Sequence, residues 1–474
     1  MDKDESGLMT QTISLPRASS DGLTDAGATA LLGGTVLANV IFGAATIVAP
    51  SVATEVGADA GAAGLFVALF SAGFAAVLVL GGRLGDRLGR RRLFRAGLVL
   101  LALTSLAVSL VPGLAGLLVV RAAQGVATGL LLPQALTTIQ ATTSGTRRTR
   151  LTSIYAAVLG VGTTVGQIGA GALAALGPSS WRLAFAAIGV LAIVVLCVTG
   201  LIPETRSPSE PGIDVFGSIL LATAIVALLV PLGLGRSLGW PWWTAASLAA
   251  SLLAAIVLTA WERRLPSHRA LLPREVLRTP MLRVGLLLTA LFFTGYGAFV
   301  FLFSSTASAR LGLDPLAVGI SLAPFAGAFI TGTLLSPRLA IRFGAPSLMR
   351  GSAVVQAVAL LAIGLMVWLE WPAPSMLGMQ PALLLLGFAQ ALMYTPLIGT
   401  IMGSLPHELA GMASGLLATV QQAGLAVGVA VIAVLADVFS AAGGAGFAAC
   451  LLLNVLLAIA FAVTAGRLRR LSPQ

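Results

Sequence analysis

The chain alternates long apolar stretches with short polar breaks from residue 28 to residue 465. A helix needs about 20 mostly apolar residues to cross the hydrocarbon core of a bilayer. Only 9% of the residues are charged, whereas a water-soluble protein carries about 25%. The sequence therefore predicts an all-α protein embedded in a lipid bilayer. Segmentation at the spanning length predicts fourteen transmembrane helices, at residues 28–50, 62–82, 94–113, 115–140, 151–175, 182–202, 215–235, 241–260, 282–305, 315–335, 347–369, 375–400, 411–436 and 444–465.

The formal net charge of +11 would suggest a nucleic-acid partner in a soluble protein. In a membrane protein the same excess arises because basic residues concentrate in cytoplasmic loops. No nucleic-acid motif, dinucleotide fingerprint or metal-ligand cluster is present in the sequence. We therefore expect no nucleic-acid partner, no metal, no cofactor and no enzymatic activity. Cys197 and Cys450 lie in apolar runs and are expected to be small buried side chains.

The basic residues predict the orientation of the helices. With the N-terminus inside, the loops on that side hold 24 of the 28 Lys and Arg residues, and the opposite loops hold Arg182, Arg236 and Arg310. This asymmetry places both termini in the cytoplasm and requires an even number of helices. Six tryptophans fall at predicted outer helix ends and Trp261 falls at an inner end, as expected for an interfacial aromatic belt.

Three local matches in the same order indicate an internal duplication. The pattern Arg-Leu-x-x-Arg-x-Gly occurs at 83–89 and 338–344, Ala-Gln at 123–124 and 389–390, and Gly-x-x-x-Gly at 162–166 and 424–428. Duplicated halves with a substrate site at their interface are a recurrent transporter plan. The predicted organisation is a cytoplasmic tail at 1–27, a six-helix bundle at 28–204, two inserted transmembrane helices at 205–265, a second six-helix bundle at 266–466 and a tail at 467–474.

The loop after the second predicted helix reads Gly82-x-Leu84-Gly85-Asp86-Arg87-x-Gly89-Arg90-Arg91-Arg92. Its position and composition resemble motif A of the major facilitator superfamily, and Arg121-x-x-Gln124-Gly125 resembles motif B of the same family. Trp181-Arg182-Leu183-Ala184-Phe185 and Gln421-Gln422-Ala423-Gly424 are similar to the 14-helix drug:H+ antiporter branch. The resemblance covers nearly all the chain after residue 28 and implies the major facilitator fold.

The resemblance implies a conformational gate built from motif A. In this family the motif A aspartate caps a neighbouring helix and pairs with arginines, which assigns Asp86 and Arg87 to a latch. A carboxylate at a helix N-terminus contributes about 0.3–1 kcal/mol. The gate residues are Gly82, Asp86, Arg87, Gly89 and Arg90. The alternative is a solvated loop of cytoplasmic charges. The second copy has Ile341 at the position of Asp86, so the latch would be one-sided.

Arg121 is a charge inside a predicted span, and such residues are functional by default. Arg121 and Gln124 share one helix face, which we expect to look into the central cavity. The alternative is that Arg121 extends its guanidinium to the outer membrane surface. The other residues predicted to line the cavity are Asn39, Tyr155, Gln167, Tyr296, Gln390 and Tyr394, for which the alternative is packing between helices.

The segment 162–171 resembles motif C, the glycine-rich antiporter motif, but Gln167 stands where that motif has proline. Its glycine spacing favours close helix packing. The predicted packing residues are Gly162, Gly166, Gly171, Gly424 and Gly428. A second departure is that residues 28–54 hold no acidic residue, although drug antiporters of this branch usually carry one there. By elimination, the candidates for a proton-carrying group are Glu55, Asp86 and Asp437.

These features predict secondary active efflux of small amphipathic compounds of the drug or antibiotic type across the bacterial cytoplasmic membrane. The expected mechanism is alternating access by a monomer, with H+ as the coupling ion by resemblance. Arg121 and the absence of a buried carboxylate favour neutral or anionic substrates. The first alternative is a facilitator, or a specific metabolite or lipid exporter or importer, without proton antiport. The second alternative is a sensor or scaffold that has kept the fold without transport.

Overall fold

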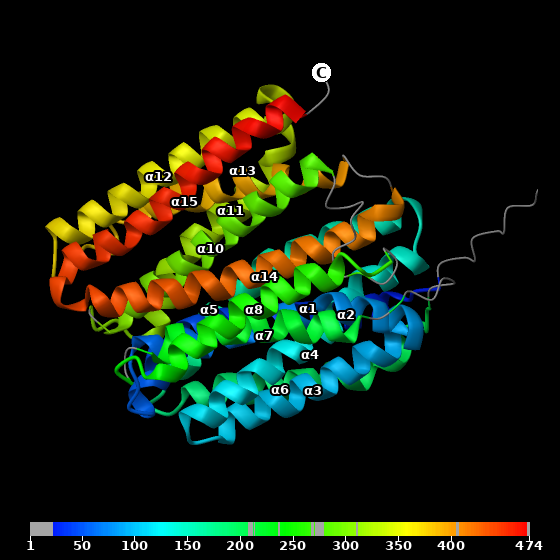
Figure 1. The fold of residues 1–474 in the computed structure, drawn as a ribbon, viewed down its shortest axis with the longest axis horizontal. Helices are drawn as coiled ribbons and strands as arrows, with labels where there is room; N and C mark the ends of the chain where they lie inside the picture. The colour runs from blue at the N-terminus through cyan, green and yellow to red at the C-terminus, as the bar shows by residue number, and fades with distance from the viewer. Residues whose placement is uncertain are drawn as a thin grey trace, which may run out of the picture.

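The computed structural model describes residues 22–206, 212, 214–235, 238–266, 270, 279–309, 311–403 and 407–471. Within these residues the regular structure is helical throughout (Figure 1). The long helices are α1 (Asp25–Glu55), α2 (Ala60–Leu88), α3 (Arg90–Leu110), α4 (Leu114–Thr142), α5 (Gly145–Ala174), α6 (Trp181–Val198), α7 (Val215–Leu234), α8 (Trp242–Glu262), α10 (Pro280–Ala309), α11 (Pro315–Phe343), α12 (Ala345–Leu369), α13 (Gln380–Gly403), α14 (His407–Val438) and α15 (Gly443–Leu471).

Among the described residues, 13 helices are long and apolar enough to cross a membrane. The predicted span at 151–175 corresponds to α5, whose 30 residues are enough to cross a bilayer. Its sequence carries arginines in the first turns and Thr, Gly and Gln further along. The helix packs between α1 and α11.

Several predicted boundaries differ from the structure because helix ends depend on capping as well as on apolar length. The helix predicted at 62–82 continues to Leu88, so most of the motif A residues expected in a loop lie in α2. The N-terminal tail was expected to reach residue 27, but α1 begins at Asp25. The Thr24 hydroxyl accepts a hydrogen bond from the Gly27 amide at 3.1 Å, and Asp25 adds an acidic first turn. At the other end, α15 continues to Leu471. Most of the tail predicted at 467–474 is therefore helical.

The two halves repeat the same helix pairings. In the N-terminal half α1 packs on α5, α2 on α4 and α3 on α6. In the C-terminal half α10 packs on α14, α11 on α13 and α12 on α15. The halves meet through α2 with α14 and through α5 with α11. This arrangement agrees with the predicted duplication, and the pair α7 and α8 is an addition to it.

The five predicted packing glycines lie at close helix contacts. A Cβ at Gly166 would lie 2.2 Å from the carbonyl oxygen of Val40 on α1. A Cβ at Gly428 would lie 2.1 Å from the carbonyl oxygen of Thr294 on α10. Gly162 and Gly424 approach the same two helices one turn earlier, and Gly171 faces Pro315 of α11. Any side chain at 166 or 428 would push these helix pairs apart.

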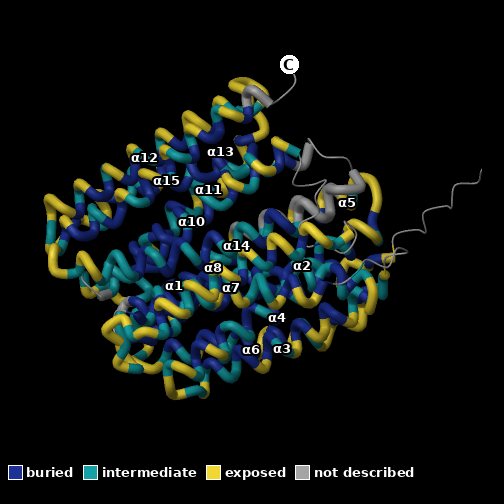
Figure 2. Tube along the Cα trace, viewed as in Figure 1, coloured by how far each residue is buried: buried dark blue, intermediate teal, exposed yellow. Residues whose placement is uncertain are grey.

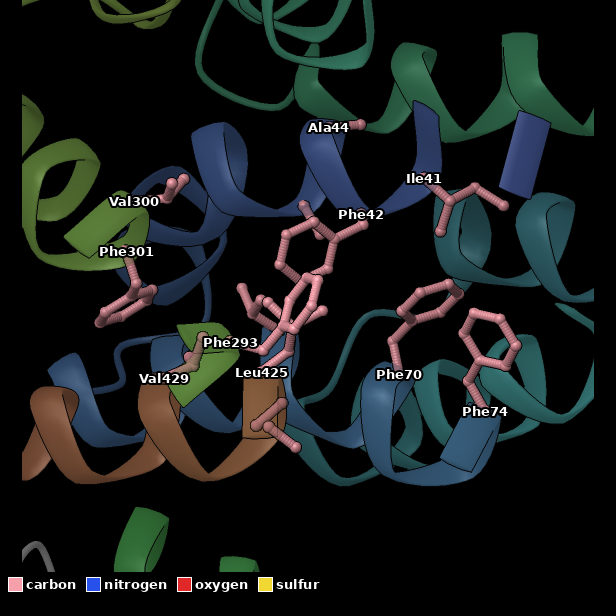
Figure 3. Packing of buried hydrophobic residues seen from close by; sticks show 14 of the residues in the cluster. Ile41, Phe42, Ala44, Phe70, Phe74, Phe293, Val300, Phe301, Leu425 and Val429 are labelled. Atoms are coloured by element: carbon pink, nitrogen blue, oxygen red, sulfur yellow. The ribbon is translucent and has the colours of Figure 1, made fainter. Parts of the chain in front are cut away.

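Buried apolar side chains form one cluster that runs through both halves. Figure 3 shows members from α1 and α2, such as Phe42 and Phe70, and members from α10 and α14, such as Phe293 and Leu425. Exposed positions run along the outer helices (Figure 2). Several of them are apolar, including Val190, Leu191 and Val194 on α6. A surface of this kind is suited to lipid rather than to water.

Two expectations about individual side chains are wrong. Trp181 was assigned to an interfacial belt, but it is fully buried. Its indole packs edge-on against Phe66 and Phe185, and its Nε1 donates to Glu55 at 2.6 Å. Cys197 was expected to be buried, and it is exposed on the outer helix α6, whereas Cys450 is buried. In both cases the sequence placed the residue correctly along its helix but did not predict the direction of its side chain.

Candidate functional site

Arg121 lies in the interior of the N-terminal half and is fully buried. Its Nε donates to the Phe66 carbonyl at 3.0 Å, and its Nη1 donates to Gln124 Oε1. Gln124 in turn donates from Nε2 to the Ser105 hydroxyl at 2.8 Å. The guanidinium carbon also lies 4.9 Å and 4.8 Å from the ring centres of Phe66 and Phe70, and 5.6 Å from that of Phe185.

This geometry differs from the expectation that Arg121 and Gln124 look into a central cavity. All the partners named above belong to α2, α3, α4 and α6 of the same half, and none is a carboxylate. The guanidinium is fully buried within the protein, so it is not extended toward solvent, which was the alternative. Three aromatic faces, a backbone carbonyl and an amide offset part of its lost hydration, although its buried Nη2 has no hydrogen-bond partner. The network therefore joins four helices of one half.

The C-terminal half holds an aromatic cluster that includes two predicted cavity residues. Phe292 of α10 stacks between Tyr296 and Tyr394, with ring centres 6.4 Å and 5.3 Å apart and planes within 12° and 16° of parallel. Phe293 meets Tyr394 edge-on at 5.1 Å. Phe325 of α11 lies 6.4 Å from Tyr296. The Tyr394 hydroxyl contacts Gln421 Oε1 of α14 at 3.4 Å, so the cluster draws on four helices.

Tyr155 brings the N-terminal half to this cluster. It is buried on α5, and its hydroxyl lies within electrostatic range of Tyr394. Tyr155 of the N-terminal half therefore lies near Tyr394 of the C-terminal half, while the ring contacts of the cluster are made by Tyr296 and Tyr394. Gln390 lies one turn before Tyr394 on α13, is buried and leaves its Oε1 without a hydrogen-bond partner. This convergence of π faces, hydroxyls and one unsatisfied amide is typical of a small-molecule site.

Asn39 and Gln167 lie at helix contacts. The Asn39 amide donates to the Thr35 carbonyl of its own helix at 3.0 Å, and its Cβ faces Gly162 on α5. Gln167 is buried, and its backbone carbonyl faces Gly319 of α11, where an added Cβ would lie 3.0 Å away. Packing between helices, the alternative considered from the sequence, describes the contacts of both residues.

The motif A segment covers the last turns of α2 and the first residues of α3, and ion pairs stabilise it. Arg90 donates from Nη2 and Nε to Asp86 Oδ1 at 2.7 and 3.1 Å. Gly89 has φ +112, a conformation that L side chains rarely adopt, and a Cβ there would lie 2.6 Å from Glu204 Oε1. Glu204 also accepts from the Arg91 amide at 3.1 Å. These contacts join α2 and α3 to the segment after α6.

Asp86 pairs with Arg90, so two of the five predicted gate residues contact each other. The side chain of Asp86 accepts from Arg90, the first residue of α3, while Arg87 is exposed and Gly82 faces Pro133 of α4. Sequence reasoning also missed Glu204. The signal was present, since an acidic residue directly after α6 stands at the same predicted membrane side as the arginine-rich loop.

A cavity of about 440 Å³ lies at the opposite end of the molecule, between the halves. It is lined by Ser51, Thr54, Glu55 and Asp59 from the end of α1 and the start of α2, and by Ser305 and Ser308 of α10. Glu55 is held by Arg182, whose Nη2 lies 2.7 Å from Oε1. One of the three proton-carrier candidates therefore faces a cavity but already has a cationic partner.

Comparison with known proteins identifies the family. The model of the Major Facilitator Superfamily matches residues 31–429. The chain is 30% identical over 354 residues to the probable actinorhodin transporter of Streptomyces coelicolor, covering 73% of this chain and 61% of that protein. It is 29% identical to the tetracenomycin C resistance and export protein of Streptomyces glaucescens, covering 73% and 63%. The chain thus spans about three fifths of the length of these curated relatives.

Solved structures support the same fold. A mutant of the peptide transporter POT has a TM-score of 0.69 with 17% identity, covering 94% of this chain and 96% of that one. The xylose transporter XylE from E. coli, in a partially occluded inward-open conformation, has a TM-score of 0.62 with 17% identity, covering 94% and 99%. The chain is a multi-pass protein of the bacterial cytoplasmic membrane, and it belongs to the Major Facilitator Superfamily.

Proposed function

We propose that the chain exports small amphipathic compounds of the drug or antibiotic type by alternating access of its two halves, as a monomer and in exchange for protons. Two relatives are named as an actinorhodin transporter and a tetracenomycin C export protein, which supports efflux as the direction. The substrate would bind where Tyr155 of one half approaches Tyr394 of the other. Rocking of the halves would then expose this site to each membrane side in turn.

The observation that carries this proposal is the aromatic cluster at the junction of the halves. Phe292, Tyr296 and Tyr394 present nearly parallel rings, and Tyr155 approaches from the other half. Stacked rings bind flat apolar surfaces, and hydroxyl and amide groups orient the polar edges of a ligand. A substrate bound there contacts both halves, so their relative motion can change its exposure.

The test is accumulation of cationic, neutral and anionic dyes and antibiotics in an efflux-deficient bacterium that expresses the chain. Cells that express Tyr394→Ala at the same level provide the matched control. We expect the wild type to lower accumulation of at least one compound, and a protonophore to abolish that effect. Unchanged accumulation across the panel would contradict drug efflux. Efflux that persists in the presence of the protonophore would contradict proton exchange but not drug efflux.

The second candidate function is a facilitator or a carrier of one metabolite or lipid without proton exchange. Within the described ranges, the buried carboxyl groups are those of Asp214 and Glu262, and both residues flank helices rather than occupying mid-span positions. Proton-coupled carriers commonly use an ionisable group in the membrane interior. Transport of a single compound that ignores the protonophore would favour this second function.

A further inference from the structure

The inserted helices have a polar attachment to the N-terminal half that motif A does not account for. Arg83 begins the Arg-Leu-x-x-Arg-x-Gly pattern, and it is 8% exposed on α2. Its Nη1 donates to the Gly212 carbonyl at 2.9 Å, just before α7. Its Nη2 donates to the Ala270 carbonyl at 2.5 Å, after α8. One guanidinium therefore binds the chain on both sides of the inserted pair.

Two buried carboxyl groups face the same guanidinium. Asp214 and Glu262 are each 4% exposed, and both lie within electrostatic range of Arg83. Asp214 caps α7, because its Oδ1 accepts from the Gly217 amide at 2.9 Å, and it also accepts from Trp261 Nε1 at 3.1 Å. Glu262 ends α8. A Cβ at Gly217 would contact both carboxyl groups, so they lie close to one another.

Such a cluster depends on its cation. Two carboxylates that share a buried site repel each other and lose hydration, and a nearby guanidinium offsets both effects. An arginine is suited to this role because its planar fork can donate to several acceptors at once. Removal of the cation would leave two buried like charges at the start of α7 and the end of α8. The inserted pair would then be destabilised at this end.

The inserted pair also lies at the seam between the halves. α7 packs along α2 and touches α14, while α2 and α14 pack on each other, and α8 packs on α7 (Figure 1). At the far end of α7, a Cβ at Gly61 of α2 would lie 2.3 Å from the Gly233 carbonyl oxygen. α7 is therefore joined to α2 at both ends, by charge at one and by backbone contact at the other. α7 therefore contacts both halves, whereas α8 packs mainly on α7.

We propose that Arg83, Asp214 and Glu262 form a buried charge clasp that fixes α7 and α8 to the N-terminal half. The pair then moves with α2 and meets the C-terminal half along α14. The clasp itself follows from the contacts above, and its effect on transport rests on the proposed function. The corresponding arginine of the second half, Arg338, is exposed on α11 and provides a matched control.

The test is hydrogen exchange of the purified full chain in detergent, followed in the first two turns of α7. We expect Arg83→Gln to speed exchange there by at least about tenfold, because the segment opens locally. Asp214→Asn with Glu262→Gln should have a similar effect, since it leaves Arg83 buried without its counter-charges. The triple neutral variant should return exchange toward the wild-type rate. Arg338→Gln should leave the exchange of α7 unchanged.

The outcomes separate the clasp from a general effect on folding. Unchanged exchange in Arg83→Gln, or equal acceleration in Arg338→Gln, would overturn the proposal. If Arg83→Gln does not accumulate in cells, recovery of folded protein in the triple variant supports the clasp, and continued loss overturns it. Hydrogen exchange and the recovery of folded protein need no substrate. Their outcome is therefore independent of the outcome of the efflux test. A loss of efflux in Arg83→Gln that the triple variant reverses would extend the clasp to transport.

Discussion

Positions 121 and 387 occupy the same place in the two halves, three residues before Gln124 and Gln390. Position 121 is an arginine surrounded by three aromatic rings, and position 387 is a glycine. A Cβ at Gly387 would lie 2.1 Å from the Phe325 carbonyl oxygen, so α11 and α13 approach too closely there for any side chain. At this position the repeated helix pair holds a buried cation in one half and a close backbone contact in the other.

This difference separates the roles of the two halves. In the N-terminal half, the Phe66 and Phe70 rings face a buried guanidinium and stabilise the interior. In the C-terminal half, Phe325 contacts Tyr296, and the aromatic cluster extends to α13 and toward Tyr155 of the other half. One half of the duplicated fold therefore contains a buried polar network around Arg121. The other half has an aromatic cluster near the junction of the halves.

The largest expected effect comes from removing the cation. Arg121→Ala would empty a fully buried volume and leave Gln124 without its donor. We expect the free energy of unfolding to fall by about 2–5 kcal/mol. Arg121→Lys should recover little, because an ammonium cannot match the fork and ring contacts of the guanidinium. Thermal unfolding in detergent measures both variants, and a lysine variant as stable as the wild type would contradict this role.

A smaller loss is expected at the matching position of the other half. Gly387→Ala places a methyl group against a backbone carbonyl, and overpacking of this kind costs about 1–3 kcal/mol. The matched control is Gly351→Ala on α12, where an added Cβ meets nothing within 4 Å. Thermal unfolding again provides the measurement. Equal stability of the two alanine variants would show that α11 and α13 are not in close contact.

Motifs and duplication could be read from the sequence because they depend on residue order. The helix pairings of the two halves and the close contacts at Gly166 and Gly428 follow from short repeated patterns. The direction of a side chain around its helix was harder to predict. Arg121 and Trp181 both point into the N-terminal half. Their side chains donate hydrogen bonds to residues far along the chain, Phe66 and Glu55. Apolar length and periodicity carry no information about such partners.

Motif A allows a further comparison of the two halves, between Asp86 on α2 and its counterpart Ile341 on α11. Asp86 pairs with Arg90 at 2.7 Å, whereas Ile341 is 88% exposed. The side chain of Asp86 is 28% exposed, so Asp86→Asn should lower the free energy of unfolding by no more than about 1 kcal/mol. Ile341→Asn should change stability even less. If motif A governs gating, efflux should fall in Asp86→Asn and persist in Ile341→Asn at matched expression. Equal efflux by the two variants would count against a gate at Asp86.

The smallest expected effect concerns the tyrosine hydroxyl at the junction. Tyr394→Phe keeps the ring that stacks on Phe292 and removes the contact with Gln421, which at 3.4 Å is a long hydrogen bond. Stability should fall by about 0.5 kcal/mol, at the low end for a hydrogen bond. If substrates bind through stacking, the apparent affinity of an exported dye should change by no more than about threefold in this variant. Tyr394→Ala, which removes the ring, should weaken it far more. A phenylalanine variant as impaired as the alanine variant would place recognition in the hydroxyl, and the C-terminal half would then contribute polar selection as well as π surface.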